Sequence, residues 1–302
     1  MTLRHHLACN SSVKGTDMTH LTYLEAAVVG LIQGVSELFP VSSLGHNVLI
    51  PALIGGQWAA DLDVAKPESP YLAFIVGLHV ATAIALLVYF WRDWLRLVPA
   101  GFATIRDRSF DSDPDRRLAW LLVVATVPAL IIGVLLNDVV EERFREVGLV
   151  ALMLVVGAAI MWLADHWGPK RLLAVDLTFP KALGLGFAQA LALIPGVSRS
   201  GISISAGLFA SLDRESAARF SFLMATPITA AAAAYESLKL VRGDLGIAVE
   251  WLPLIAGMVA ALLSGLLAIS VLLRFLRTRS LNIFVAYRLV LAAVVLVVFL
   301  ER

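Results

Sequence analysis

Two stretches of this 302-residue sequence decide how the chain folds: residues 33–46 read QGVSELFPVSSLGH, and residues 189–201 read QALALIPGVSRSG. Each interrupts a long apolar segment, 21–54 or 182–212, with proline and glycine. In a bilayer, such irregular backbone persists only where protein or a water-filled cavity satisfies its polar groups. We therefore expect each segment to fold as helix, loop, helix and to form a re-entrant hairpin.

The composition is that of an integral membrane protein, because 59% of the residues are hydrophobic and only 16% are charged, far from the averages of soluble domains. Outside the two interrupted segments, six apolar stretches are long enough to cross ~30 Å of hydrocarbon as helices. These predicted spans are 71–91, 118–136, 147–164, 216–235, 252–273 and 283–300. The sequence thus predicts an all-α integral membrane protein with six transmembrane helices and two re-entrant helical hairpins.

Charge and cysteine content exclude other classes. A formal net charge of +1 leaves no basic surplus for a nucleic-acid backbone. The single cysteine, Cys9, excludes an intrachain disulfide and a cysteine-based zinc site. Residues 1–20 are polar and lack the apolar run of a signal peptide, so we expect an N-terminal extension followed by one polytopic domain over 21–302.

The two breaks resemble each other. Residues 41–45 (VSSLG) align with 197–201 (VSRSG) at an offset of 156 residues, about half the chain. Each half contains one hairpin followed by three spans, and an odd number of crossings inverts the second half. We expect an inverted-topology repeat, 21–164 and 182–300, whose broken helices meet near the midplane.

The distribution of basic residues predicts the orientation. The three loops at 92–117, after 164 and after 273 carry twelve Lys and Arg residues, whereas the loops on the other side carry five. Because basic loops stay in the cytoplasm, the first hairpin is expected to open outward.

The second break has the composition of an anion site. Two glycines, Gly196 and Gly201, allow close approach of the backbone, and serine hydroxyls and Arg199 stand directly before a helix. Backbone N–H groups at a helix N-terminus favour a phosphate-like anion, and a guanidinium adds two parallel donors. The alternative is a tight turn with Arg199 snorkelling to the interface. The expected phosphate-binding residues are Ser42, Gly196, Ser198, Arg199, Ser200, Gly201 and Ser203.

The first break contains Glu37, Ser42, Ser43 and His46 within ten residues. This set suits acid–base chemistry or a divalent ion that bridges to phosphate oxygens. Glu37 is a candidate metal ligand, with Gln33 as a neutral oxygen ligand. The alternatives are a purely structural pair between Glu37 and the arginine of the other break, and a packing role for His46.

These motifs resemble those of the bacitracin-resistance family, the undecaprenyl-diphosphate phosphatases. Residues 33–46 look like that family's (E/Q)xxxE motif and the PVSSxGH segment after it, and residues 195–203 resemble its PGxSRSxxT motif. The resemblance extends over roughly 21–302. Two long motifs in the right order make it specific.

The resemblance implies hydrolysis of a polyprenyl diphosphate, the C55 lipid carrier of cell-wall synthesis, to the monophosphate and inorganic phosphate. It also implies a prokaryotic plasma membrane, an outward-open site, resistance to bacitracin and a divalent cation such as Mg²⁺ or Ca²⁺. Catalytic roles carry over to Glu37, Ser43, His46 and Arg199, with Ser43 attacking and His46 as base, or with His46 or Glu37 activating a water. Gln33 replaces a common glutamate, and His79 stands near a position where relatives carry glutamine.

The rival class is a transporter that carries a lipid phosphate across the bilayer, because inverted repeats with broken helices also build transporters. A transporter needs no nucleophile, so it tolerates the loss of Ser43 and His46. A homodimer is a further expectation, since the small-residue run 257–265 suits helix packing within one chain or between two.

Overall fold

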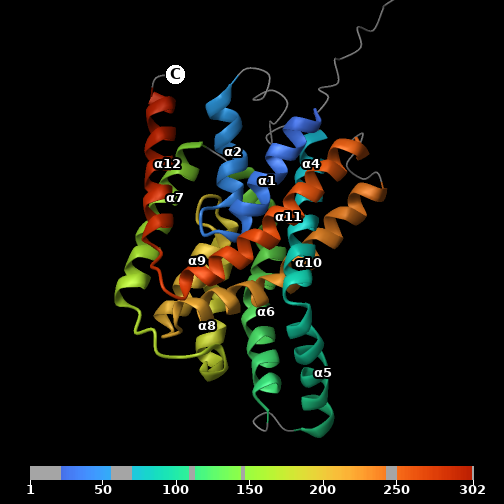
Figure 1. Cartoon of the computed structure of the whole chain (residues 1–302), viewed down its shortest axis with the longest axis vertical. Coiled ribbons are helices and arrows are strands. Elements are labelled where there is room, and N and C mark those ends of the chain that lie inside the picture. The colour runs from blue at the N-terminus through green and yellow to red at the C-terminus, as the bar shows by residue number, and fades with distance from the viewer. Residues whose placement is uncertain (1–21, 56–69, 109–112, 144–146, 243–249, 301–302) are drawn as a thin grey trace, which may run out of the picture.

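The computed structural model describes residues 22–55, 70–108, 113–143, 147–242 and 250–300, and the regular elements of these residues are helices (Figure 1). The elements are α1 (Tyr23–Leu38), α2 (Ser43–Ile54), α4 (Pro70–Tyr89), α5 (Trp91–Asp107), α6 (Pro114–Arg143), α7 (Val147–Trp167), η1 (Ala174–Asp176), α8 (Phe179–Ala190), η2 (Leu191–Leu193), α9 (Arg199–Phe209), α10 (Arg214–Arg242), α11 (Trp251–Leu276) and α12 (Asn282–Leu300). The all-α prediction is confirmed, and the predicted extension 1–20 lies outside the described residues.

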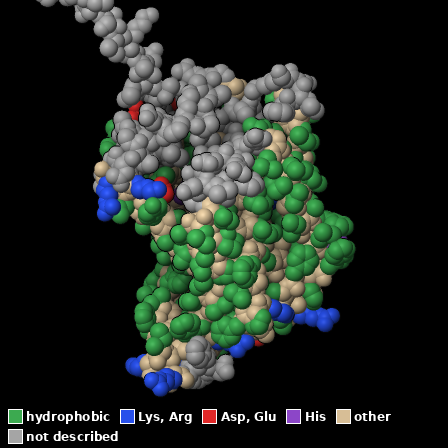
Figure 2. Space-filling model, turned by 180° about the vertical axis from the view of Figure 1, so that it is seen from behind, with side chains coloured by type: hydrophobic (Ala, Val, Ile, Leu, Met, Phe, Trp, Pro, Cys, Tyr) green, Lys and Arg blue, Asp and Glu red, His purple; other side chains and the backbone are tan. Residues whose placement is uncertain are grey.

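Four described helices are long and apolar enough to cross a membrane, which makes the chain a multi-pass membrane protein. Their apolar spans are Pro114–Leu136, Val147–Trp167, Arg214–Lys239 and Trp251–Leu276. The bent pair α4–α5, whose axes differ by 77°, gives a fifth if it counts as one span. Figure 2 shows hydrophobic side chains over most of the face between the two ends of the molecule.

Two further predicted spans are helical, but only part of each enters this count. The predicted span 71–91 is α4, which ends at Tyr89 before the bend into α5, and only its part from Phe74 enters the count. The predicted span 283–300 is α12, whose described apolar part is Asn282–Val298. The described helices therefore support four or five spans by length and composition.

Both interrupted segments fold as helix, loop, helix, as predicted. α1 is followed by α2, and α8 continues through η2 to a loop that leads into α9. In both loops the serine before the second helix has a left-handed backbone, with φ of 73° at Ser42 and 74° at Ser198. Each serine hydroxyl accepts a hydrogen bond from the amide of a glycine three residues on, Gly45 N at 3.3 Å and Gly201 N at 3.2 Å. Capping thus offsets a conformation that costs a non-glycine residue ~1–2 kcal/mol.

Small residues let α1 lie directly against α11. A Cβ on Gly34 would overlap Ser264 and the carbonyl of Ala261, and one on Gly30 would overlap the backbone of Gly257. Close backbone approach through glycine is the usual way for helices to associate in lipid. The small-residue run 257–265 therefore packs within the chain, and the homodimer stays a prediction.

Ion pairs hold the helices together near the bend between α4 and α5 and near the start of α10. Asp93 of α5 pairs with Arg219 of α10, with 2.7 Å between Asp93 Oδ2 and Arg219 Nη2. Asp165, at the end of α7, accepts from Arg214 Nε at 2.6 Å and from the amide of Leu281 at 3.0 Å. One carboxylate thus fixes the starts of both α10 and α12, the helices that approach the two loops.

Candidate functional site

The two loops face each other across a cavity of about 300 Å³. Its polar lining comes from both halves of the chain and consists of Ser36, Glu37, Ser42, Ser43, His79, Gln189, Ser198, Arg199 and Thr229. Helix α6 adds Ala129 and the loop before α9 adds Gly196. Segments about 160 residues apart in sequence therefore build one site.

An ion pair between the loops lies at the centre of this site. Arg199 Nη2 donates to Glu37 Oε1 at 2.7 Å, and both side chains are mostly buried, with 18% and 9% of their surface exposed. The second terminal nitrogen of Arg199 donates to Thr229 of α10. Removing two charges from water costs free energy that their attraction need not recover. Stabilisation of the fold is therefore not by itself a sufficient reason for this pair to be present.

Three more side chains lie near the second carboxylate oxygen of Glu37. Ser43 Oγ donates to Oε2, Gln33 Nε2 donates to it at 3.3 Å, and His79 Nε2 lies 3.7 Å away. Gln33 is itself held by Asn47, whose Nδ2 donates to Gln33 Oε1 at 3.1 Å. Both polar ends of Gln33 are thus engaged, and Glu37 is fixed from several sides.

His46 points to α12 and not to the serine three residues before it. Its Nδ1 lies 2.7 Å from the carbonyl of Ser42, so Nδ1 carries a hydrogen, and its Nε2 lies 2.6 Å from the hydroxyl of Tyr287. The two rings stack with centroids 5.7 Å apart. In the described structure Ser43 is therefore paired with Glu37, and His46 is paired with Tyr287.

Arg288 holds the two loops in place, a role the sequence did not indicate. Its side chain is fully buried, and its guanidinium donates to the carbonyls of Gly196 at 2.7 Å, Val197 at 3.0 Å and Pro40 at 3.3 Å. A further bond reaches the carbonyl of Leu154 at 3.2 Å. The available signal was a lone cation inside an apolar helix, which marks a functional position by default.

The predicted phosphate-binding residues divide into two groups. Ser42, Gly196, Ser198 and Arg199 line the cavity. The others do not line it: Ser200 Oγ donates to the carbonyl of Phe39 at 2.9 Å, Gly201 donates to Ser198, and Ser203 is buried within α9. Thr229, which Arg199 contacts, was not predicted, although a hydroxyl two residues after Pro227 in an apolar helix was a visible signal.

Two polar side chains that line the cavity have hydrogen-bonding atoms without a partner among the described residues. Both ends of the Gln189 amide are buried and unpaired, and so is Ser36 Oγ. Gln189 stands 156 residues after Gln33, whose amide is fully engaged. An unpaired buried amide is costly, so a bound group or water at Gln189 is the expected complement.

The described residues contain no cluster of three or more His, Cys, Asp or Glu able to hold a metal ion. Glu37 is the carboxylate in the cavity, and its oxygens already bind Arg199, Ser43 and Gln33. Mg²⁺ commonly takes one or two carboxylates together with substrate phosphates. The donor set therefore fits a cation that arrives with a phosphate ligand, and not a preformed all-protein site.

The sequence is similar to a known family over nearly its whole length. The family described as bacitracin resistance protein BacA matches residues 26–294. An undecaprenyl-diphosphatase from Mycolicibacterium paratuberculosis is 45% identical over 292 residues, which cover 89% of this chain and 94% of the relative. Proteins of the same name from Moorella thermoacetica and Desulforudis audaxviator are 42% and 41% identical, covering 93% and 92% of this chain and 100% and 98% of theirs.

Proposed function

The chain belongs to the bacitracin resistance protein family, and from this membership we infer that it is an undecaprenyl-diphosphatase. It hydrolyses the polyprenyl diphosphate to the monophosphate and inorganic phosphate, and the family attribute of bacitracin resistance follows from recycling this lipid. The observation that carries the inference is the identity of 45% over 89% of the chain. The transport alternative gains no support from these relatives.

In the mechanism we propose, Arg199 binds the diphosphate. Its guanidinium lines the cavity between Glu37 and Thr229. Phosphoryl transfer depends mostly on positioning and on donors that meet the charge developing in the transition state. Arg199 exchanges its contact with Glu37 for phosphate oxygens as the substrate enters, and Ser198 and the Gly196 backbone lie beside it.

Glu37 is the base that the geometry favours for Ser43, because the serine hydroxyl donates directly to Glu37 Oε2. Ser43 Oγ attacks the terminal phosphorus while its proton passes to Glu37, and the bond to the bridging oxygen breaks to release the polyprenyl monophosphate. Water then cleaves the phosphoserine and releases inorganic phosphate, which restores the Ser43 hydroxyl, and Glu37 loses the proton that it took up in the first step. The variant mechanism uses water as the direct nucleophile, with Glu37 as its base. His46 acts by holding the start of α2 through Ser42 and Tyr287.

Gln189 and Ser36 are proposed to meet the head group or its hydrolytic water, because their polar atoms lack partners at the cavity. A divalent cation, Mg²⁺ or Ca²⁺, would be held by Glu37 and the diphosphate and would neutralise phosphate charge. Gln33 contributes by orienting Glu37, through the bond from its Nε2.

The predicted membrane arrangement stays our proposal: six spans and two re-entrant hairpins in the single domain 21–302, with repeats 21–164 and 182–300. Support comes from equivalent details 156 residues apart. Ser42 and Ser198 share a positive φ, 73° and 74°. Gly30 lies against α11, and its equivalent Gly186 lies against α6. The outward opening of the site, at the plasma membrane, rests on the twelve basic residues of 92–117, 165–181 and 274–279, which we propose to lie on the cytoplasmic side whether they belong to helices or to loops.

Phosphate release from C55 diphosphate by the purified full chain in detergent tests the function. We expect release with Mg²⁺ or Ca²⁺ that a chelator abolishes, and loss of release in Arg199→Ala and Glu37→Ala. Arg277→Ala is the matched control, because Arg277 pairs with Glu215 on the exposed surface. Folded wild-type protein that releases no phosphate with either cation would contradict the proposal.

The test of Ser43 separates the two nucleophiles. If the serine attacks, Ser43→Ala abolishes turnover, and brief incubation of wild type with substrate labelled with ³²P at its terminal phosphate leaves acid-stable label on the protein. If water attacks, Ser43→Ala keeps measurable turnover and no label is retained.

A further inference from the structure

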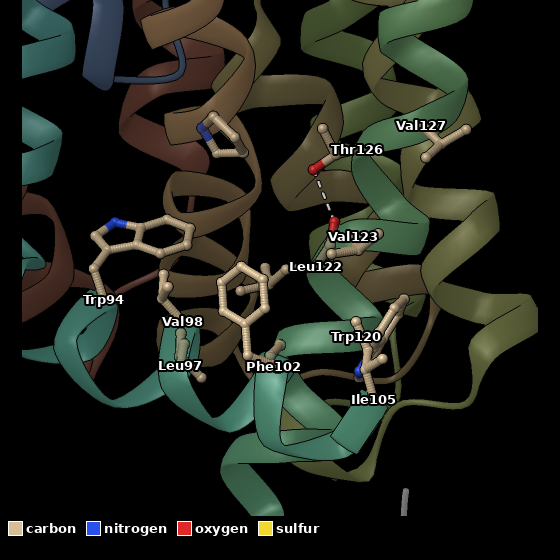
Figure 3. Close-up of a pocket in the computed structure, with 13 residues that line it drawn as sticks. Trp94, Leu97, Val98, Phe102, Ile105, Trp120, Leu122, Val123, Thr126 and Val127 are labelled. Carbon is tan, nitrogen blue, oxygen red and sulfur yellow. Dashed lines mark hydrogen bonds between the residues drawn. The ribbon is translucent and has the colours of Figure 1, made fainter. Parts of the chain in front are cut away.

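A second cavity, an apolar groove of about 360 Å³, lies between α5 and α6 (Figure 3). Helix α5 lines it with one apolar stripe at helical spacing: Trp94, Leu97, Val98, Gly101, Phe102 and Ile105. Such a stripe normally packs onto a neighbouring element. Part of this stripe on α5 is not covered by other described residues, since 71% of the Phe102 surface is exposed.

The opposite wall, formed by α6, is apolar as well. Ala119, Val123 and Val127 line it, and the one hydroxyl among the described lining residues belongs to Thr126. That hydroxyl donates to the carbonyl of Leu122 at 2.7 Å, as the dashed line in Figure 3 shows. The wall therefore offers no free polar group from this threonine, and the groove suits a hydrocarbon.

The groove adjoins the site that binds the diphosphate. On α10, Pro227 lines the groove, while the next residues, Ile228 and Thr229, line the site cavity. On α6, Val127 lines the groove and Ala129 lines the site cavity. Residues two apart on a helix point to nearly opposite sides, whereas Leu122 of the groove and Ala129 of the site cavity are seven apart on one face of α6, about 10 Å along its axis.

We propose that this groove binds the first isoprene units of the substrate's polyprenyl chain while the diphosphate occupies the site cavity. The proposal rests on the proposed function, because it needs a substrate whose charged head is joined to a long hydrocarbon. The two adjoining cavities match that chemistry: one carries Arg199 and hydroxyl groups, and the other is apolar.

Membrane phospholipid is the competing occupant of any apolar groove that faces lipid. The substrate chain has an advantage, because the head group bound at Arg199 holds its first isoprene units beside the groove. Binding of the second part of a linked ligand is intramolecular and benefits from a high effective concentration. A phospholipid chain lacks this link.

Narrowing the groove tests the proposal through the preference for chain length. A Cβ on Gly101 would lie 3.6 Å from the Ala119 Cβ, an ordinary contact, so the larger side chain of Gly101→Leu extends into the groove. Gly133→Leu is the matched control, because a Cβ on Gly133, also in a membrane helix, meets nothing within 4 Å.

The readout is the ratio of kcat/KM for C55 diphosphate to kcat/KM for isopentenyl diphosphate, which carries one isoprene unit. We expect this ratio to fall about tenfold or more in Gly101→Leu, the scale on which a hydrophobic pocket discriminates a lost methylene. It stays at the wild-type value in Gly133→Leu. An unchanged ratio in Gly101→Leu overturns the proposal.

A labelling experiment reads occupancy without turnover. The only cysteine, Cys9, is replaced by serine, and Val123→Cys is labelled with a membrane-permeant maleimide. A non-hydrolysable C55 methylenediphosphonate is expected to slow labelling at least fivefold, whereas the one-isoprene analogue and added phospholipid leave it unchanged. Equal protection by phospholipid overturns the proposal. If wild type hydrolyses neither diphosphate, the proposed function fails, and this protection still reports on the groove.

Discussion

Replacing Arg288 with methionine is expected to loosen both loops of the site although this side chain does not line the cavity. The guanidinium donates to the carbonyls of Gly196 at 2.7 Å and Val197 at 3.0 Å in one loop and to the carbonyl of Pro40 at 3.3 Å in the other. Methionine keeps an unbranched, flexible chain at a fully buried position but donates to none of them.

The size of the effect follows from the carbonyls that lose their donor. A buried polar group left without a partner costs about 1–3 kcal/mol, so the two shortest bonds alone give roughly 2–6 kcal/mol. At about 2 °C per kcal/mol for a chain of this size, the midpoint of thermal unfolding in detergent should fall by roughly 4 °C or more. Arg288→Lys keeps a cation with three donors and should lose less stability than Arg288→Met.

Scanning tryptophan fluorescence gives the unfolding midpoint, and phosphate release from C55 diphosphate gives the activity. Arg288→Met should lower both. A methionine variant that unfolds at the wild-type temperature and hydrolyses substrate at the wild-type rate would refute the reasoning.

Three further changes test particular contacts. Gly34→Ala should destabilise the protein by about 1–3 kcal/mol by overpacking against Ser264, and an unchanged midpoint of thermal unfolding would contradict the close packing of α1 on α11. Asp165→Asn should cost about 3–5 kcal/mol because it leaves the Arg214 cation unpaired, and Asp165→Asn combined with Arg214→Gln should recover part of this loss in thermal unfolding. Gln189→Leu should lower kcat/KM for C55 diphosphate about tenfold or more without lowering the unfolding midpoint, since it removes an amide that has no partner among the described residues; wild-type kinetics would show that this amide has no role at the site.

The sequence was sufficient to predict the features that depend on local pattern. Proline and glycine within apolar segments marked both breaks, and the structure has helix, loop, helix at each. The structural alternative considered for Glu37, a pair with Arg199, anticipated the contact that joins the loops at 2.7 Å. Intramembrane charges of opposite sign find each other because lipid offers no other partner.

Features that depend on helix rotation were not predictable from the pattern. His46 meets Tyr287, 241 residues later in the chain, and not the nearby Ser43. Tertiary packing decides which face of α12 turns toward α2. Hydrophobic periodicity does not predict that face when a helix is apolar all round. Helix α5 was missed as well: the predicted loop 92–117 was wrong over most of its length, because Trp91–Asp107 is a helix that carries charged residues beside its apolar ones.

We propose that Glu37 and Arg199, one from each half of the chain, act as a unit on the same diphosphate. A double-mutant cycle tests it most directly, with kcat/KM for C55 diphosphate measured for wild type, Glu37→Gln, Arg199→Lys and the combined variant. If the pair acts as a unit, the combined variant is hardly slower than the slower single variant, because effects of such residues are far from additive. If the two losses simply multiply, the residues act independently and the claim is wrong.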